Sequence, residues 1–290
     1  KTLFSSPHSI TPFPKSKIFM VFCCLYLPVS IYLRSKILNM FTQLYKNKRA
    51  IWYPINETEE TKGTILFLPG FPKYPSHSDF IDFFKKEKYN ILVPMYSGTF
   101  DSGGKFSIKN AVIDAKFWYD FLEKKVVQYG PHKTKTVEQS ELILFSSSFG
   151  GLIAGLALKK YSLPKIKKSI FVSPLWDMTA YRNNTLSLQT ARETSEIMSF
   201  AYPFSYRFEN KKRFFDEIKG LSPISDISKP FIDQEKQFVV FCGKEDKITP
   251  VTMAETLVKE PKNSKLHIIG GGHSSKIEWG KFIKLIKEII

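Results

Sequence analysis

The chain has 290 residues, 43% of them hydrophobic and 26 of them phenylalanine, so it is long enough to bury a large core as one α/β domain. Its formal charge of +16 would suit nucleic acid or an anionic membrane, but the lysines are spread along the chain, without an arginine-rich arm, a zinc-ligand spacing or an RNA-binding signature. We therefore expect a lysine-rich solvated surface and no nucleic-acid partner.

The three cysteines are Cys23, Cys24 and Cys242. An odd count without a regular spacing argues against a disulfide framework and for a reducing compartment, so we expect a cytoplasmic protein. None of the three has a partner at a metal-site spacing.

The N-terminal extension, residues 1–49, contains the most apolar run of the chain, residues 18–33. The run is short for a spanning helix, which needs about 20 apolar residues, and it carries Pro28. No small-residue cleavage site follows it, which argues against a signal peptide. Two interpretations remain. In the first, the run is a membrane anchor or membrane-associated helix. In the second, which we favour, it is not part of the mature protein, because the chain opens with lysine and Met40 starts a segment that leads straight into the predicted domain.

From Ala50 onwards, apolar runs and helical spacings alternate. They predict strands at 50–55, 64–69, 90–95, 142–147, 168–173, 237–242 and 265–269. They predict a helix that Ser78 and Asp79 can cap, and further helices at 108–129, 149–161, 251–259 and 276–289. This alternation predicts a mostly parallel sheet with helices on both faces.

The alternation is interrupted between Leu175 and Glu235. This stretch is rich in aromatic residues but has only helical or irregular patterning. We expect an insertion of about residues 175–235 that covers one edge of the sheet as a cap or lid.

A run of three serines lies where a predicted strand turns into a helix. The sequence Ser146-Ser147-Ser148-Phe149-Gly150 partly matches the motif G-x-S-x-G of a nucleophile elbow, in which a sharp turn exposes the serine hydroxyl and aims the next amide at a developing oxyanion. Ser146 replaces the first glycine. Ser146 and Ser147 are alternative nucleophiles, but only Ser148 is followed two residues later by the glycine that the turn requires. Taken alone, the stretch also fits a Gly/Ser-rich turn without chemistry.

An acid and a histidine follow two later strands. Asp246 comes after the strand at 237–242, and His273 follows three glycines after the strand at 265–269. In open α/β sheets chemistry lies beyond the carboxyl ends of the strands, so we expect these side chains to lie near the serine. A neutral imidazole can take the serine proton, and a carboxylate can fix its tautomer and stabilise the imidazolium. Serine, acid and histidine in this order predict a serine hydrolase.

Other polar residues compete for these roles or lie near them. Glu245 and Asp177 are alternative acids, because each also lies close after a predicted strand. His77 follows the turn at 69–71 and is expected to line the pocket, whereas His132 and His267 are expected to be structural.

With these motifs the chain resembles the α/β-hydrolase family, in its serine esterase, lipase and peptidase-like branch. The matching motifs are Leu68–Phe71, Ser146–Gly151, Gly243–Pro250 and Gly270–His273, and the loop 96–107 looks like the substrate-side loop of esterases and serine peptidases. The resemblance covers about residues 50–290. It implies an eight-stranded, mostly parallel sheet with a cap inserted after the sixth strand. The chain departs from the family pattern at Ser146, usually glycine, and at Pro69, where many members have the histidine of an H-G turn.

Carried over residue by residue, the resemblance makes Ser148 the nucleophile, Asp246 the acid and His273 the base, with an oxyanion hole formed by the amides of Phe71 and Phe149. It implies hydrolysis through an acyl-enzyme, with neither a metal nor an organic cofactor. The aromatic and apolar cap favours a small-molecule ester, as in a carboxylesterase or lipase. A serine peptidase or aminopeptidase of the same fold and a noncatalytic basic protein that binds membrane or nucleic acid are the alternatives.

Overall fold

The computed structural model describes residues 40–55, 59–71, 78–124, 126–128, 134–136, 141–178, 205–224, 226–233 and 235–290. Residues 40–290 form one compact unit. The apolar run at 18–33, Cys23, Cys24, His77 and His132 lie outside the described residues, as do residues 179–204 of the expected cap. Within the described part of the chain, no helix is long and apolar enough to cross a membrane.

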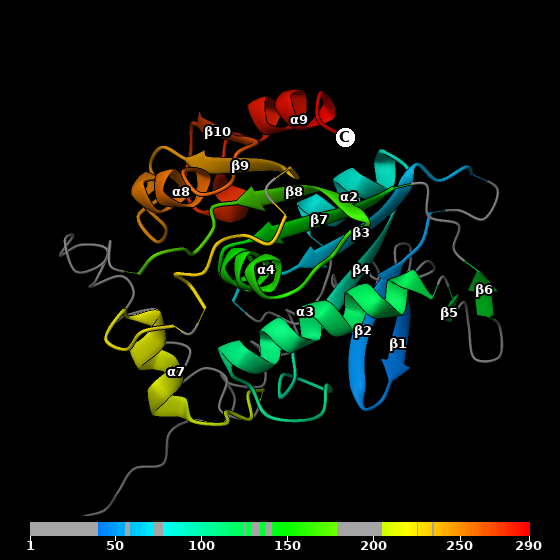
Figure 1. Ribbon diagram of the computed structural model, residues 1–290. Coiled ribbons are helices and arrows are strands. Elements are labelled where there is room, and N and C mark those ends of the chain that lie inside the picture. The colour runs from blue at the N-terminus through cyan, green and yellow to red at the C-terminus, as the bar shows by residue number, and fades with distance from the viewer. Residues whose placement is uncertain are drawn as a thin grey trace, which may run out of the picture. The chain divides into compact units, whose positions relative to one another are not determined.

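An eight-stranded sheet forms the centre of the fold, in the spatial order β1-β2-β4-β3-β7-β8-β9-β10 (Figure 1). Only β2 runs against the other strands of this sheet, because it is antiparallel to both β1 and β4 while the remaining neighbours are parallel. The mostly parallel sheet is therefore confirmed. Its strands are β1 (Phe41–Tyr45), β2 (Lys48–Tyr53), β3 (Gly63–Leu68), β4 (Tyr89–Met95), β7 (Leu142–Ser147), β8 (Ile166–Val172), β9 (Gln237–Gly243) and β10 (Ser264–Ile269).

The sheet begins at Phe41, ahead of the first predicted strand at Ala50. Lys46 and Asn47 have φ values of 48° and 64°, so they form the two-residue turn with two left-handed positions that matches the twist of a β-hairpin. β1 was not predicted from the sequence because Gln43 is its only buried residue, so the strand has no apolar face to detect.

Helices cover both faces of the sheet, as predicted (Figure 1). On one face, α3 (Ile108–Glu123), α4 (Phe149–Lys160) and α8 (Val251–Val258) share a core that α7 (Lys211–Ile218) extends. On the other face, α2 (Asp79–Lys86) and α9 (Trp279–Lys287) bury phenylalanine side chains against the sheet. The Ser78 side chain caps α2 by accepting a hydrogen bond from the Ile81 amide, which confirms the predicted helix start.

The helix predicted over 108–129 is shorter than expected and ends at Glu123. The Lys124 amide folds back onto the carbonyls of the last turn, and the chain then enters a short hairpin of β5 (Val126–Gln128) and β6 (Thr134–Thr136). The β-branched pair Val126-Val127 fits a strand better than a helix, which explains the change of structure.

The last helix also begins later than predicted. Residues Ser274–Lys276 form a 3-10 turn, and α9 starts at Trp279. Between them Ile277 makes a bridge to Gly271, and the Glu278 amide donates to the Gly270 carbonyl at 2.7 Å. The backbone of this segment is therefore used to fix the glycine loop that precedes His273.

Part of the expected insertion lies beside the loop at 96–107. The Arg207 amide donates to the Gly98 carbonyl at 2.7 Å, and the Phe106 amide donates to the Arg207 carbonyl at 2.7 Å. The Arg207 guanidinium donates to the Phe100 carbonyl at 2.9 Å. The described residues 205–209 are thus joined to this loop, whereas the assignment of 175–235 as a cap over the domain at 50–290 stays a prediction.

Candidate active site

The three-serine stretch forms a sharp turn between β7 and α4. Ser148 has φ 51° and ψ −122°, a conformation that L-residues rarely adopt and that costs about 1–3 kcal/mol. Backbone hydrogen bonds hold it there: the Ser148 amide donates to the Val172 carbonyl at 3.0 Å, and the Ser148 carbonyl accepts from the amides of Gly151 and Leu175 at 2.8 and 2.9 Å. The left-handed residue is Ser148, and Ser146, in the usual glycine position, does not have a positive φ.

Gly150 is required by close packing of this turn. A Cβ at this position would lie 2.1 Å from the Leu68 carbonyl oxygen and 2.5 Å from that of Pro69. Atoms never approach so closely, and backbone carbonyls in a sheet cannot move aside easily. The glycine that singled out Ser148 in the sequence therefore allows α4 to start directly against the end of β3.

The three serines have different surroundings. Ser146 is fully buried, and its hydroxyl donates to the Ile170 carbonyl of the neighbouring strand at 3.4 Å. Ser147 is 4% exposed and still belongs to β7. Only Ser148 stands at the tip of the turn, half-buried, with its hydroxyl at the imidazole of His273.

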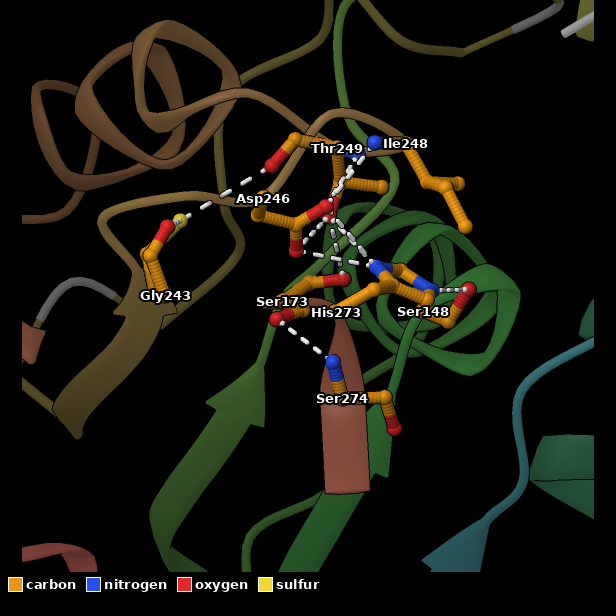
Figure 2. A network of polar contacts seen from close by, with 9 residues as sticks. Ser148, Ser173, Gly243, Asp246, Ile248, Thr249, His273 and Ser274 are labelled. Atoms are coloured by element: carbon orange, nitrogen blue, oxygen red, sulfur yellow. Dashed lines mark hydrogen bonds and ion pairs between the residues drawn. The ribbon is translucent and has the colours of Figure 1, made fainter. Parts of the chain in front are cut away.

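Ser148, His273 and Asp246 form one continuous chain of hydrogen bonds (Figure 2). His273 Nε2 lies 2.9 Å from Ser148 Oγ, and Nδ1 lies 2.9 Å from Asp246 Oδ2 and 3.1 Å from Oδ1. The three residues follow β7, β9 and β10, so strands of one sheet deliver them to the same edge. The structure thus brings together the three residues that the sequence selected.

Asp246 is buried, at 5% exposure, yet it is fully provided with donors. Its Oδ1 accepts from the amides of Ile248 and Thr249, both at 2.9 Å, and its Oδ2 accepts from the Thr249 hydroxyl at 2.9 Å. Burial by itself raises the pKa of the carboxyl. This effect is outweighed by the hydrogen bond and charge of His273, the Thr249 amide and the Ser173 hydroxyl. The pKa of Asp246 therefore lies below its usual value.

The ionised carboxylate fixes the tautomer of His273. A carboxylate can only accept, so Nδ1, which faces it, carries the hydrogen. Nε2 is then left with a free lone pair that accepts the Ser148 hydroxyl hydrogen. This is the orientation that a general base needs.

Two residues of this network were missed by the sequence analysis. The Ser173 hydroxyl accepts from the Ser274 amide at 3.0 Å, and the Ser173 carbonyl oxygen lies 3.1 Å from the Thr249 hydroxyl, so Ser173 joins the loop of the acid to the loop that carries His273 (Figure 2). The Thr249 hydroxyl lies between Asp246 and His273, 3.1 Å from Nδ1, and no role of its own in the site was predicted for Thr249 from the sequence. Both are small polar residues that follow strands closely, a pattern too common to single them out.

The alternative acids occupy other positions. Glu245 is exposed to solvent, and Asp177 lies in the segment after β8 with φ 41°. Nδ1 of His273 contacts Asp246, so neither alternative takes that place.

His267 lies in β10, where its ring stacks on Phe241 at a centroid distance of 5.0 Å, a packing contact.

The turn at Pro69-Gly70-Phe71 passes beside the serine. A Cβ on Gly70 would lie 3.2 Å from Ser148 Cβ, and the Tyr96 hydroxyl donates to the Pro69 carbonyl at 3.1 Å, which fixes the turn. The rings of Phe71 and Phe149 pack at a centroid distance of 5.7 Å. The turn is therefore near Ser148, while the aim of the Phe71 and Phe149 amides at an oxyanion stays a prediction.

A cluster of aromatic rings surrounds these two residues and is called the aromatic cluster below. Phe106, Phe149 and Phe214 are each at most 2% exposed. The members are Phe71, Tyr96, Phe106, Phe149, Tyr206, Phe208 and Phe214, each of which contacts at least one other ring of the group. The cluster joins the turn after β3, the loop at 96–107, the start of α4 and α7.

No protein-family profile and no curated protein matches the sequence. Solved structures do match. Est1E from Butyrivibrio proteoclasticus is similar with a TM-score of 0.57 and 16% identity over 87% of this chain and 97% of that one. The Pyrococcus furiosus esterase Pf2001 has a TM-score of 0.59 and 18% identity over 86% and 88%. A puromycin-hydrolyzing peptidase from Mycobacterium tuberculosis has a TM-score of 0.56 and 14% identity over 86% and 38%.

Proposed function

Because the chain has the α/β-hydrolase fold, we propose that it is a serine hydrolase that cleaves carboxylic esters through a Ser148–His273–Asp246 triad. One observation carries the proposal: the unbroken chain of hydrogen bonds from Ser148 Oγ through both imidazole nitrogens to a buried carboxylate. A serine held in a strained turn, facing a histidine that an ionised acid orients, is the arrangement that makes a hydroxyl nucleophilic.

In the proposed reaction Ser148 Oγ attacks the carbonyl carbon of the ester while its proton passes to His273 Nε2. Asp246 accepts the hydrogen bond from Nδ1 and stabilises the positive imidazolium. The carbonyl oxygen becomes an oxyanion, which the backbone amides of Phe71 and Phe149 are proposed to stabilise.

The tetrahedral intermediate then collapses. The bond from carbon to the alcohol oxygen breaks, and the alcohol leaves with the proton from Nε2, so the acyl group stays on Ser148. A water molecule repeats the sequence: it gives its proton to Nε2, attacks the acyl carbon and releases the acid as Ser148 regains the proton. Protons therefore pass only between Ser148, His273 Nε2, the leaving alcohol and the water, while Asp246 stays ionised and the two amides donate hydrogen bonds without losing their protons.

Esters are the proposed substrates because the walls beside Ser148 are aromatic and apolar. Phe71 and Phe149 lie next to the turn that carries the serine, and the rest of the aromatic cluster extends from them. Apolar rings suit the acyl group of an ester and offer no charged partner for a peptide terminus. A serine peptidase of the same fold is the alternative, and one similar structure is named a peptidase.

The proposal is tested with a panel of p-nitrophenyl esters assayed beside aminoacyl p-nitroanilides. The wild type should hydrolyse the esters faster, and Ser148→Ala should lose at least about 10⁴-fold in kcat. Ser147→Ala is the matched control, because it removes the neighbouring hydroxyl but leaves the chain of hydrogen bonds intact. Cleavage of the anilides alone would replace the esterase by a peptidase, and undiminished turnover by Ser148→Ala would refute the nucleophile.

A further inference from the structure

A cavity of about 590 Å³ lies between the start of α3, the end of α4 and α7. This volume falls in the range of pockets that bind small molecules. The buried residues that line it are the apolar Ile108, Val112, Leu156, Phe214 and Ile224, together with one carboxylate, Glu217, which pairs with the Arg213 guanidinium at 2.9 Å. The charged residues Lys109, Lys160 and Arg213 also line it but are exposed, so they form its rim.

The cavity does not reach the catalytic centre. Ser148, His273, Phe71 and Phe149 are not among the described residues that line it. The cavity nevertheless lies close by, because α4 runs from Phe149, next to the serine, to Lys160 on the cavity rim.

Among the described residues that line the cavity, Phe214 also belongs to the aromatic cluster beside Ser148. Its ring lines the cavity, and it also packs against Phe71 at 5.8 Å and Phe149 at 6.0 Å between ring centroids. The side chain is buried, at 2% exposure, and Phe106 supports it from another side at 4.9 Å. A rigid ring packed on several sides is held in place, because any rotation would open gaps against its neighbours.

We propose that Phe214 sets the length of the acyl chain that the enzyme accepts, by closing the route from Ser148 into this cavity. The inference rests on the proposed esterase function and adds its substrate class: esters of short-chain acids. An acyl chain that extends from the carbonyl on Ser148 along the Phe149 ring meets Phe214. Beyond that ring, the buried apolar lining would accept methylene groups that the wild-type protein cannot place.

The test compares kcat/KM for p-nitrophenyl acetate, butyrate, octanoate and dodecanoate. The wild type should prefer acetate or butyrate. Phe214→Leu and Phe214→Ala should move the optimum to octanoate or beyond, because each methylene group that enters apolar surroundings increases kcat/KM about fourfold. Phe214→Leu keeps most of the packing and is the variant to assay if Phe214→Ala fails to fold.

The matched control is Phe215→Leu. Phe215 lies on the same helix and is also buried, at 8% exposure, and its ring contacts Phe208 and Phe214. It is not among the described residues that line the cavity, so its removal loosens α7 without opening the wall. Phe215→Leu should keep the wild-type chain-length profile.

The outcomes separate the two proposals. A wild type that hydrolyses esters while Phe214→Leu and Phe214→Ala keep its chain-length profile contradicts the role of Phe214 and leaves the esterase function intact. An equal shift in Phe215→Leu, or a wild type that already prefers dodecanoate, contradicts it too. A wild type that hydrolyses none of the esters refutes the esterase function and the chain-length role together.

Discussion

Two groups of residues adjoin Ser148 and are called the polar side and the aromatic side below. On the polar side, Asp246 and His273 are positioned by hydrogen bonds between 2.9 and 3.1 Å long. On the other side, the aromatic cluster is held by ring packing, with centroids 4.9 to 6.4 Å apart and no shared orientation. A hydrogen bond disappears when one atom is removed, whereas packing energy is spread over many atoms and weakens gradually as a side chain becomes smaller. Small substitutions should therefore affect turnover on the polar side, and stability and selectivity on the aromatic side.

The largest effect is expected for Asp246→Asn. The amide can donate to Nδ1, which favours the wrong imidazole tautomer, so kcat should fall by about 10⁴-fold while the protein remains folded. Glu245→Gln, an exposed neighbour, is the matched control and should keep its activity. Steady-state kinetics on a p-nitrophenyl ester measure both. An Asp246→Asn enzyme with nearly normal kcat would move the acid to Glu245 or Asp177.

Gly150→Ala tests the backbone on which both sides depend. The added methyl group meets the carbonyls of Leu68 and Pro69, so we expect a loss of about 3 kcal/mol in the free energy of unfolding, together with displacement of the serine turn. The control is Gly280→Ala in α9, where a Cβ meets nothing within 4 Å and a gain of up to about 1 kcal/mol is expected. Equal urea midpoints for the two variants would contradict the packing argument.

Thr249→Val removes one donor from the carboxylate while keeping the shape of the side chain. The Asp246 Oδ2 atom loses its 2.9 Å hydrogen bond, and kcat should fall about tenfold with little change in KM. Thr249→Ser retains the hydroxyl and should restore kcat. If Thr249→Ser is as slow as Thr249→Val, the methyl group rather than the hydrogen bond explains the loss.

Phe106→Leu probes the aromatic side. Phe106 is fully buried and packs against Phe149, Tyr206 and Phe214, so the smaller side chain should lower the free energy of unfolding by about 1 kcal/mol. Turnover should stay within about threefold, because none of the catalytic hydrogen bonds is touched. A loss of kcat comparable to that of Thr249→Val, measured on the folded variant, would remove the contrast between the two sides.

The smallest effect concerns acid stability. The pKa of Asp246 is lowered in the folded protein, so its contribution to stability is present above the unfolded value of about 3.9 and is lost as the pH falls through the lowered pKa. The difference in free energy of unfolding between wild type and Asp246→Asn should therefore be constant at neutral pH and shrink below about pH 4. A difference that does not change with pH would show that the carboxylate is not stabilised by folding.

The layered fold and the proximity of Ser148, Asp246 and His273 were predictable because their sequence signals are local, whereas the catalytic roles of these residues stay a prediction. Ser148 and Asp246 each closely follow a strand that is a buried apolar run, and His273 follows the more exposed strand β10 after three glycines. Gly150, two residues after Ser148, also singled out this serine, because the turn requires a residue without a side chain at that position. The apolar pattern did not predict β1, because this strand lacks an apolar face. It also placed the end of α3 too late, because β-branched residues follow Glu123.

The supporting residues were not predictable for the opposite reason. Ser173 and Ser274 are 101 residues apart in the sequence, and Thr249 and Ser173 are 76 apart, so no spacing reveals their contact. Phe214 lies on a different helix from Phe149 and is one of 26 phenylalanines. Only the folded structure shows that its ring packs against Phe149, next to Ser148, and also lines a cavity.

Labelling with a fluorophosphonate probe, followed by peptide mapping of the adduct, tests the central claim most directly. Such probes react with a serine only when a neighbouring base activates it. The account predicts one adduct, on Ser148, that is absent in Ser148→Ala and forms far more slowly in His273→Ala. An adduct on Ser146 or Ser147, or undiminished labelling of Ser148→Ala, would contradict it.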